Sequence, residues 1–270
     1  MKAFSNHLLF EIKTGIRNKT LLIMNYLLPL GFFLMMGFVM GGIMPEFLNT
    51  MIPAIVVFAI LSATFLGIPD PLVTAREKGI FRSYKINGVP AVSILIISIL
   101  TTMVHLVITA VIIIIVAPIL FNAELPVNWL NFCIVFLAMA FACSGLSVLI
   151  GVISPNSRAT VLLSQLFFIP SNLLGGMMIP YNLLPDAAKK AAQILPPTHA
   201  MNAFKGLAMG YVSDYSPWAS VLILVGSGFL AFILAVFLFN WDNHNTEKRK
   251  LYPIAIIALL PYLIGMIFLS

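Results

Sequence analysis

The chain has 270 residues, of which 61% are hydrophobic and only 9% are charged, and its formal net charge is +6. Its mean hydropathy is +1.05. Several uncharged runs reach the roughly 18 residues that a bilayer crossing needs, which excludes an ordinary soluble domain and predicts a polytopic membrane protein. Because the basic residues fall between these runs, they indicate orientation and contact with anionic membrane lipid, and we expect no nucleic-acid partner.

The first predicted element is an amphipathic helix over residues 1–19. Apolar residues recur there at helical spacing, and the polar face includes Glu11, Lys13 and Arg17. Such a helix lies along the membrane surface, and a plain charged tail is the alternative. The charges exclude a secretory signal, so we expect the following span, residues 21–42, to remain in the mature protein.

Six membrane spans are predicted, with short polar connections between them. They cover residues 21–42, 51–73, 91–120, 130–153, 161–180 and 218–241. A last apolar run, residues 251–269, is barely long enough to cross, and it is either a seventh span or a hairpin. The predicted fold is therefore an all-α polytopic membrane protein with a single transmembrane domain, residues 1–270.

The connection formed by residues 74–90 carries five charged residues within ten positions, Arg76 to Lys85. It follows Pro69 and Pro71, which should break the preceding helix because proline lacks an amide donor. Each charge placed in hydrocarbon would cost about 2.5 to 3.5 kcal/mol, so the connection must face water. Lys and Arg in short loops mark the cytoplasmic side. The loop therefore predicts a multi-pass protein of the cytoplasmic membrane with its N-terminus inside.

Residues 181–216 are rich in proline and small residues. They contain two short amphipathic pieces, 184–195 and 198–209, separated by Pro196 and Pro197. Neither piece is long enough to span, so both are predicted to be re-entrant or interfacial helices at the outer mouth. This orientation leaves only three of the 15 Lys and Arg residues outside, namely Lys189, Lys190 and Lys205.

The predicted spans contain no Asp, Glu, Lys or Arg in their interior, and the chain has no GxxxxGK[ST] phosphate loop. Proton-coupled and many ion-coupled carriers need ionisable groups or broken helix pairs in the membrane. We therefore expect transport energy to come from ATP on a partner chain, with no catalytic residue here. No metal site is expected, because His105 has no acidic or thiol companion at ligand spacing, which favours a hydrogen-bonded interior histidine.

Four features together resemble the permease subunits of ABC-2 type ABC transporters. They are the amphipathic helix before the first span, the R-E-K-G-x-x-R segment Arg76–Arg82, the paired short helices before the sixth span, and the segment LPPTHAMNAFKGL, Leu195–Leu207. The resemblance covers nearly the whole chain. Residues 251–270 depart from it, because these permeases usually end in the cytoplasm after the sixth span.

The resemblance implies a cytoplasmic coupling helix over Thr74–Asn87 that seats in a cleft of an ATP-binding subunit. The turn Ser154–Ala159 would add a smaller contact, and residues 1–19 would also touch the ATPase. A solvated loop that only enforces topology is the alternative. The residues implicated in coupling are Arg76, Glu77, Lys78, Gly79, Arg82 and Arg158, and those of the outer segment are Pro196, Pro197, His199 and Lys205.

Physical roles can be assigned to three of the coupling residues. Gly79 permits a tight backbone between helical pieces. Glu77 and Arg82 can pair with groups of opposite charge on a partner.

The function implied is an exporter with two copies of an ATP-binding subunit, which carry the ATP and Mg, and a second permease, expected to be an identical chain. This chain itself would bind no cofactor. A passage without buried charges suits an amphipathic or hydrophobic cargo such as a drug, peptide, lipid or glycolipid. The alternatives are a secondary carrier or channel and an intramembrane serine protease, which would require Ser147 and His199 to meet.

Overall fold

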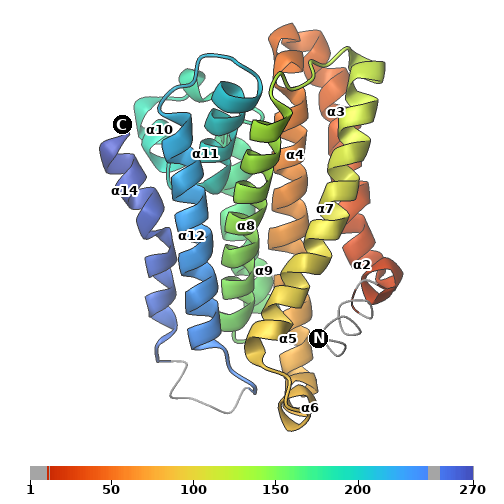
Figure 1. The fold of residues 1–270 in the computed structure, drawn as a ribbon, viewed down its shortest axis with the longest axis vertical. Helices are drawn as coiled ribbons and strands as arrows, with labels where there is room; N and C mark the ends of the chain where they lie inside the picture. The colour runs from red at the N-terminus through yellow and green to blue at the C-terminus, as the bar shows by residue number, and fades with distance from the viewer. Residues whose placement is uncertain (1–10, 12, 243–249, 270) are drawn as a thin grey trace.

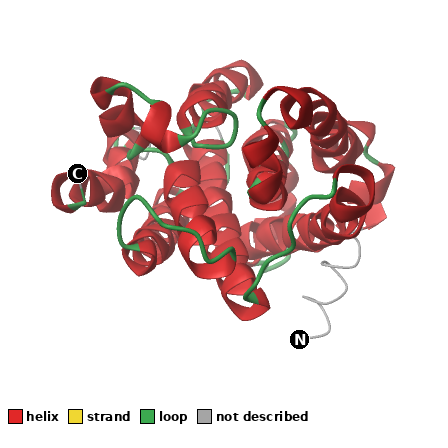
Figure 2. Ribbon diagram, turned by 90° about the horizontal axis from the view of Figure 1, so that it is seen from above, coloured by secondary structure: helices red, strands yellow, loops and turns green. Residues whose placement is uncertain are grey.

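The computed structural model describes residues 11, 13–242 and 250–269. The regular elements in these ranges are helices, without a strand among them, and Figure 1 shows the long helices side by side along one axis. Figure 2 looks along that axis and shows the helices end-on, gathered in one bundle. Helix α6 lies at one end and helices α10 and α11 at the other (Figure 1), and we name these the α6 end and the α10 end. The predicted all-α fold is confirmed.

Within the described residues, five helices are long and apolar enough to cross a membrane. Three are regular helices, and two are composite helices with a π-helical turn inside. The regular ones are α7 (Ala91–Phe121), α8 (Trp129–Ile153) and α12 (Pro217–Leu238). The first composite helix consists of α2 (Lys19–Leu22), η1 (Ile23–Leu27) and α3 (Leu28–Ile43). The second consists of α4 (Met51–Leu61), η3 (Ser62–Leu66) and α5 (Pro69–Glu77).

The two π turns, η1 and η3, contact each other. A π turn departs from the regular α-helical hydrogen-bond ladder, and side chains of neighbouring helices bond to carbonyls in η1. Ser62 Oγ donates to the carbonyl oxygen of Met24 at 3.0 Å. Thr109 Oγ1, from α7, donates to the carbonyl oxygen of Asn25 at 2.8 Å. Two buried hydroxyl groups thus satisfy the irregular backbone of the first span.

The predicted span 161–180 corresponds to α9, Ser157–Leu174, which has 18 residues. It ends earlier than predicted, and Gly176 follows with φ at +81°, a conformation that glycine adopts readily. Helix α9 contacts α5 and α10, which lie at opposite ends of the bundle. It is not among the five most apolar helices because polar side chains interrupt it, namely Ser164, Gln165, Ser171 and Asn172.

The most extensive helix pair is α8 with α12. Glycines permit their close approach, because a Cβ atom on Gly145 would lie 2.7 Å from the carbonyl oxygen of Gly228. A Cβ atom on Gly228 would lie 2.5 Å from the ring of Phe141. Small residues let helix backbones approach closely where lipid offers no hydrophobic driving force between helices. Helices α8 and α12 therefore form the most tightly joined unit of the bundle.

For the C-terminal segment 251–269, the sequence allows either a span or a hairpin. It forms a 3₁₀ helix, η6 (Tyr252–Leu259), followed by α14 (Leu260–Phe268), and both pack on α12. The two run from the α6 end back to the α10 end (Figure 1). At about 2.0 Å per 3₁₀ residue and 1.5 Å per α residue, their rise is about 30 Å, close to the hydrocarbon thickness. The segment is therefore a single pass of the bundle.

The glycine contact between α8 and α12 predicts that Gly228→Ala destabilises the protein. The added methyl group would overlap the ring of Phe141, and overpacking typically costs about 1–3 kcal/mol. Thermal unfolding in detergent measures the loss. Gly226→Ala is the matched control in the same helix, because a Cβ atom there would meet nothing closer than Pro261 at 4.0 Å. Equal melting temperatures for the two variants would show that the close approach is not needed.

Candidate functional site

The charged connection 74–90 forms a projecting tip at the α6 end (Figure 1). Helix α5 ends at Glu77, and α6 covers Ile80–Ile86. Between them, Gly79 has φ at +74°, and no atom lies within 4 Å of the place where a Cβ would stand. Backbone conformation, and not lack of space, therefore favours glycine here. The expected coupling helix Thr74–Asn87 is in fact two helices joined by a left-handed residue, and we call them the α5–α6 tip.

The helix break beside Pro69 and Pro71 differs from the prediction. The break lies before the prolines, at the turn containing Gly67, and Pro69 begins α5. The first-turn amides of a helix have no acceptor within the helix, so proline is tolerated there. The two prolines thus start a helix, although the sequence led us to expect them to end one.

Arg76 is turned into the protein, with 5% of the residue exposed. Its Nη1 donates to the carbonyl oxygen of Val152 at 2.7 Å, and its Nη2 donates to that of Ser154. These carbonyls lie at the C-terminus of α8, where no helical amide is available to them and the helix dipole favours a cation. The guanidinium of Arg76 therefore caps α8 and joins it to α5, so this member of the predicted coupling set is not an exposed contact. Its part in coupling stays a prediction.

The remaining predicted coupling residues lie at the surface of the α6 end. Ser157 Oγ lies 3.4 Å from Glu77 Oε2 and donates to it. The predicted minor contact, Ser154–Ala159, is therefore adjacent to the end of α5. The exposed members of the predicted set are Glu77, Lys78, Arg82 and Arg158.

Helix α6 is anchored to the end of α12 by an aromatic contact. The rings of Phe81 and Phe239 are 5.3 Å apart, and both residues are 3% exposed. Arg82 Nε also lies 3.7 Å from Asp242 Oδ2, a surface pair that contributes little by itself. In contrast, Ile86 is 85% exposed.

Of the predicted interface helix, residues 1–10 and 12 lie outside the described residues. Glu11 is half-buried and residues 13–17 are helical, with Lys13 and Arg17 exposed. Gly15 is buried against α7, where a Cβ atom would lie 3.3 Å from Nε2 of His105. The other nitrogen of His105 shares a hydrogen bond of 2.6 Å with the hydroxyl of Tyr26. The interpretation of His105 as a hydrogen-bonded interior histidine is confirmed.

The two short helices expected before the last long span are present at the α10 end. They are α10 (Asp186–Ala192) and α11 (Pro196–Ala203), and a π turn, η5 (Phe204–Ala208), follows. All eight residues of α11 are buried. Pro196 and Pro197 open α11 in positions where no amide donor is needed.

His199 of α11 is fully buried, and its Nε2 lies 2.8 Å from the carbonyl oxygen of Gln193. Its ring also lies 5.6 Å from that of Tyr262 in α14. Burial lowers the pKa of His199 to about 4, although the hydrogen bond to Gln193 opposes this. The imidazole is thus neutral at pH 7, and Nε2–H donates to Gln193. Ser147 Oγ has no hydrogen-bond partner in the described part of the chain, so the serine–histidine contact of a protease is not formed there.

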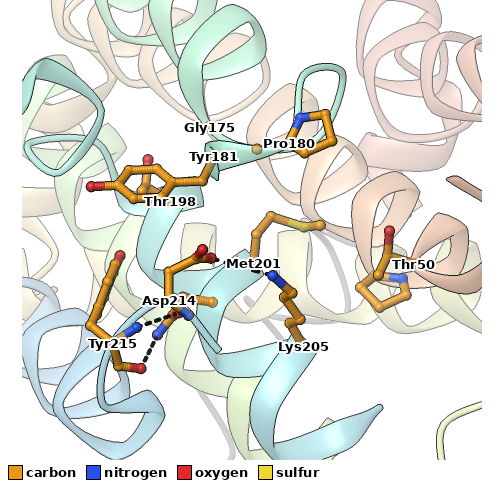
Figure 3. A pocket seen from close by; sticks show the side chains of 12 residues that line it. Thr50, Gly175, Pro180, Tyr181, Thr198, Met201, Lys205, Asp214 and Tyr215 are labelled. Carbon is orange, nitrogen blue, oxygen red and sulfur yellow. Dashed lines mark hydrogen bonds and ion pairs between the residues drawn. The ribbon is translucent and has the colours of Figure 1, made fainter. Parts of the chain in front are cut away.

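A cavity of about 90 Å³ adjoins α11 (Figure 3). Lys205 lies across it and pairs with Asp214 at 3.5 Å. Asn202 holds the facing loop: its Nδ2 donates to the carbonyl oxygen of Tyr215 at 2.9 Å, and its Oδ1 accepts from the amide of Asp214 at 2.9 Å. Neither Asn202 nor Asp214 was predicted to have a role. The only sequence signal for Asn202 was a polar amide in the short helix that follows Pro196 and Pro197.

A larger cavity of about 340 Å³ lies in the half of the bundle nearer the α6 end, between the first span, the η3–α5 junction and α9. Its lining combines apolar and polar side chains. The apolar ones include Leu21, Met24, Phe65 and Val161, and the polar ones include Asn18, Asp70, Thr160, Ser164 and Gln165. No group of three or more His, Cys, Asp or Glu residues that could hold a metal ion occurs in the ranges described.

Comparison with known proteins gives one match. The family model of the ABC-2 type transporter matches residues 6–209, which is more than half of the chain and includes both the α5–α6 tip and α11. No curated protein and no solved structure matches. The resemblance drawn from the sequence motifs is confirmed by this match.

The buried guanidinium predicts a stability effect for Arg76→Met. Removing it leaves the last carbonyls of α8 without their donors, at a cost of about 1.5–3 kcal/mol for hydrogen bonds to a charged group. Thermal unfolding in detergent should therefore show a clearly lower melting temperature. Arg82→Met, which removes the same charge from an exposed position of the same tip, is the control and should cost about 1 kcal/mol or less. Indistinguishable melting temperatures would contradict the capping role.

The buried His199 predicts a pH dependence of stability. Its folded pKa of about 4 lies below the unfolded value of 6.5, so the unfolded state binds the proton more readily between these values. The contribution of neutral His199 to the free energy of unfolding is complete above pH 6.5. It falls as the pH drops, and the loss reaches about 3 kcal/mol near pH 4. Unfolding of the wild type and of His199→Gln should be measured between pH 4 and 8. A pH slope as steep in the variant would exclude His199 as its source.

Proposed function

Because the chain belongs to the ABC-2 type transporter family, we propose that it is the permease subunit of an ATP-driven exporter. The ATP and Mg are bound by a separate ATP-binding subunit, in two copies, and two permease chains form the passage. The α5–α6 tip, which projects from the bundle while its base is fixed to α8 and α12, carries this proposal. It offers a partner surface and a rigid route into the helices.

Three contacts support a mechanical role for the tip. A push on α6 reaches α8 through the guanidinium of Arg76 and reaches α12 through Phe81. Because α8 and α12 meet at Gly145 and Gly228, they move as one unit. The 340 Å³ cavity is lined by the first span, the η3–α5 junction and α9. Closure of the ATPases would then shift α5, which Arg76 joins to α8, relative to the first span and α9, and change the shape of this cavity.

The charge distribution supports a cytoplasmic α6 end. In the described part of the chain, the basic residues at the α10 end are Lys189, Lys190 and Lys205, and the remaining ones lie toward the α6 end. Lys and Arg are enriched in cytoplasmic loops. We therefore place the protein in the cytoplasmic membrane with its N-terminus inside, and export runs toward the α10 end.

The 340 Å³ cavity supports an amphipathic cargo. Phe65 and Leu21 offer an apolar wall, and Thr160 and Gln165 offer hydrogen-bonding groups on the facing helix. A molecule with both an apolar and a polar part satisfies both walls, whereas a bare ion would leave the apolar one unmatched. Drugs, peptides, lipids and glycolipids belong to this class.

The tip predicts that Gly79→Pro abolishes ATPase binding and export. Proline fixes φ near −65°, and Gly79 has φ at +74°, so the turn that presents α6 cannot form. Glu77→Lys should also abolish export, since it reverses an exposed charge beside that turn. The measurement is a mild-detergent pull-down of the tagged permease, followed by an ATPase assay of what co-purifies.

Two controls accompany this experiment. Lys189→Gln changes a charge at the opposite end and should retain the ATPase. Size-exclusion chromatography reports whether each variant is folded. A folded, monodisperse wild type that carries no ATPase would refute the proposal of an ATP-driven exporter. Normal export by both tip variants would show that the charges of the tip only set the membrane topology.

A further inference from the structure

The 340 Å³ cavity between the first span, the η3–α5 junction and α9 carries a formal negative charge. Among the described residues that line it, Asp70 alone is charged. The residue is exposed, so its carboxylate is open to a molecule in the cavity. None of the ion pairs formed by the described residues involves Asp70. The cavity therefore has one acid that no basic side chain neutralises within the ranges described.

This acid stands in an end of the bundle that is otherwise basic. Lys19 and Arg158 belong to helices that border the cavity, but neither lines it. At physiological ionic strength, exposed charges more than about 8 Å apart are largely screened from each other. Asp70 itself lies in the first turn of α5, where the helix dipole favours a negative charge. Contact with the carboxylate thus decides which charge the cavity accepts, and a cation is attracted.

An apolar wall indicates the rest of the ligand. Leu21 and Met24 of the first span and Val161 of α9 line the cavity, and all three are partly or fully exposed. Covering such side chains is favourable by about 25 cal/mol per Å² of apolar surface. A bare metal ion would use Asp70 alone, and the described residues hold no group of three ligands for one. The cavity volume lies within the range of about 300–1,000 Å³ that suits drug-sized molecules.

Gln165 supplies a neutral polar group on the α9 side of the cavity. It is half-buried and makes no hydrogen bond in the described part of the chain, and neither of its side-chain polar atoms is closed off from the cavity. Its amide can both donate to and accept from a bound molecule. The lining thus combines one acid, one open amide and an apolar wall.

We propose that the cargo of this cavity is an organic cation. Its ammonium group lies against Asp70, and its apolar body lies along Leu21, Met24 and Val161. The inference rests on the proposed exporter for the energy and direction of transport, and it names the class of molecule that the exporter carries. Asp70 and Arg76 are both in α5, about 9 Å apart along the helix axis. A shift of α5 relative to α9 would therefore move the carboxylate that holds the cation.

The experiment is isothermal titration of the purified full chain, in an uncharged detergent, with protein-free micelles as the blank. The probes share one ring system: 2-(2-naphthyl)ethylammonium is positive, 2-(2-naphthyl)ethanol is neutral and 2-naphthylacetate is negative. We expect affinities to fall in that order. Methylammonium, which has the charge without the ring, should not displace the first probe at equal concentration. Equal binding of the ammonium and the alcohol, or displacement by methylammonium, would overturn the proposal.

Variants separate the charge from the fold. Asp70→Asn should weaken binding of the ammonium probe about fivefold, the effect of a partly screened charge pair, and leave that of the alcohol unchanged. Asp70→Glu keeps the charge and should keep the preference. Asp186→Asn removes an exposed acid at the opposite end and should leave all three affinities unchanged. A lower melting temperature of Asp70→Asn with an intact preference would show that the carboxylate only stabilises α5, contrary to the proposal.

Gln165→Lys tests the same charge without altering α5. It adds a cation to the cavity, so it should weaken binding of the ammonium probe and strengthen that of 2-naphthylacetate. Unchanged affinities for both probes in this variant would place their binding elsewhere and refute the site.

Failure of this inference is distinguishable from failure of the exporter proposal. Probe binding needs the permease alone, whereas the exporter requires the ATPase that co-purifies with it. A chain that retains the ATPase but does not prefer the ammonium probe would refute the cationic cargo only. A chain that shows the preference but carries no ATPase would refute the exporter and leave a binding site for organic cations.

Discussion

In hydrocarbon, a backbone carbonyl or amide that leaves the helical ladder must find a partner within the protein. This constraint explains the role of several buried polar side chains. Ser62 and Thr109 bond to carbonyls of the η1 turn, and Asn131 Nδ2 donates to the carbonyl oxygen of Leu207 in η5 at 3.1 Å. Arg76 does the same for the end of α8. These side chains make irregular backbone tolerable and also join one helix to the next.

The same constraint divides the bundle into regular and irregular parts. Helices α8 and α12 are regular over most of their length and meet at paired glycines. The first two spans carry π turns that contact each other. Regular helices in close contact transmit displacement, and π turns often mark functional positions where helices deform. The bundle therefore combines a closely packed helix pair with two spans that carry irregular turns.

The two ends of the bundle differ in how their polar groups are satisfied. At the α6 end, several charged side chains face outward, while Arg76 and Phe81 fix the tip from inside. At the α10 end, the buried helix α11 is held by contacts between side chains and loop backbone, such as those of Asn202. One end thus offers exposed charge. The other offers sheltered pockets suited to small polar groups.

Hydropathy and proline positions in the sequence predicted the long helices, the pair of short helices before α12, and the tight backbone at Gly79. These features follow from local chemistry, because apolar length, missing amide donors and glycine conformations act within a few residues. The early end of α9 was not predicted, because the apolar run continues past Leu174 as irregular chain. The direction of Arg76 was also missed, since an arginine in a charged loop has the same pattern whether it faces water or the end of another helix.

The sequence by itself therefore determined the membrane class, the helical fold and the family resemblance, all of which depend on composition and short motifs. Only the tertiary structure decided that Arg76 caps α8, that Phe81 meets Phe239, and that residues 251–269 make one pass along α12. It also brought Leu21, Asp70 and Gln165 around one cavity. The reason is physical: these contacts join segments that lie far apart in the chain. No local sequence pattern shows which distant carbonyl or ring a given side chain will contact.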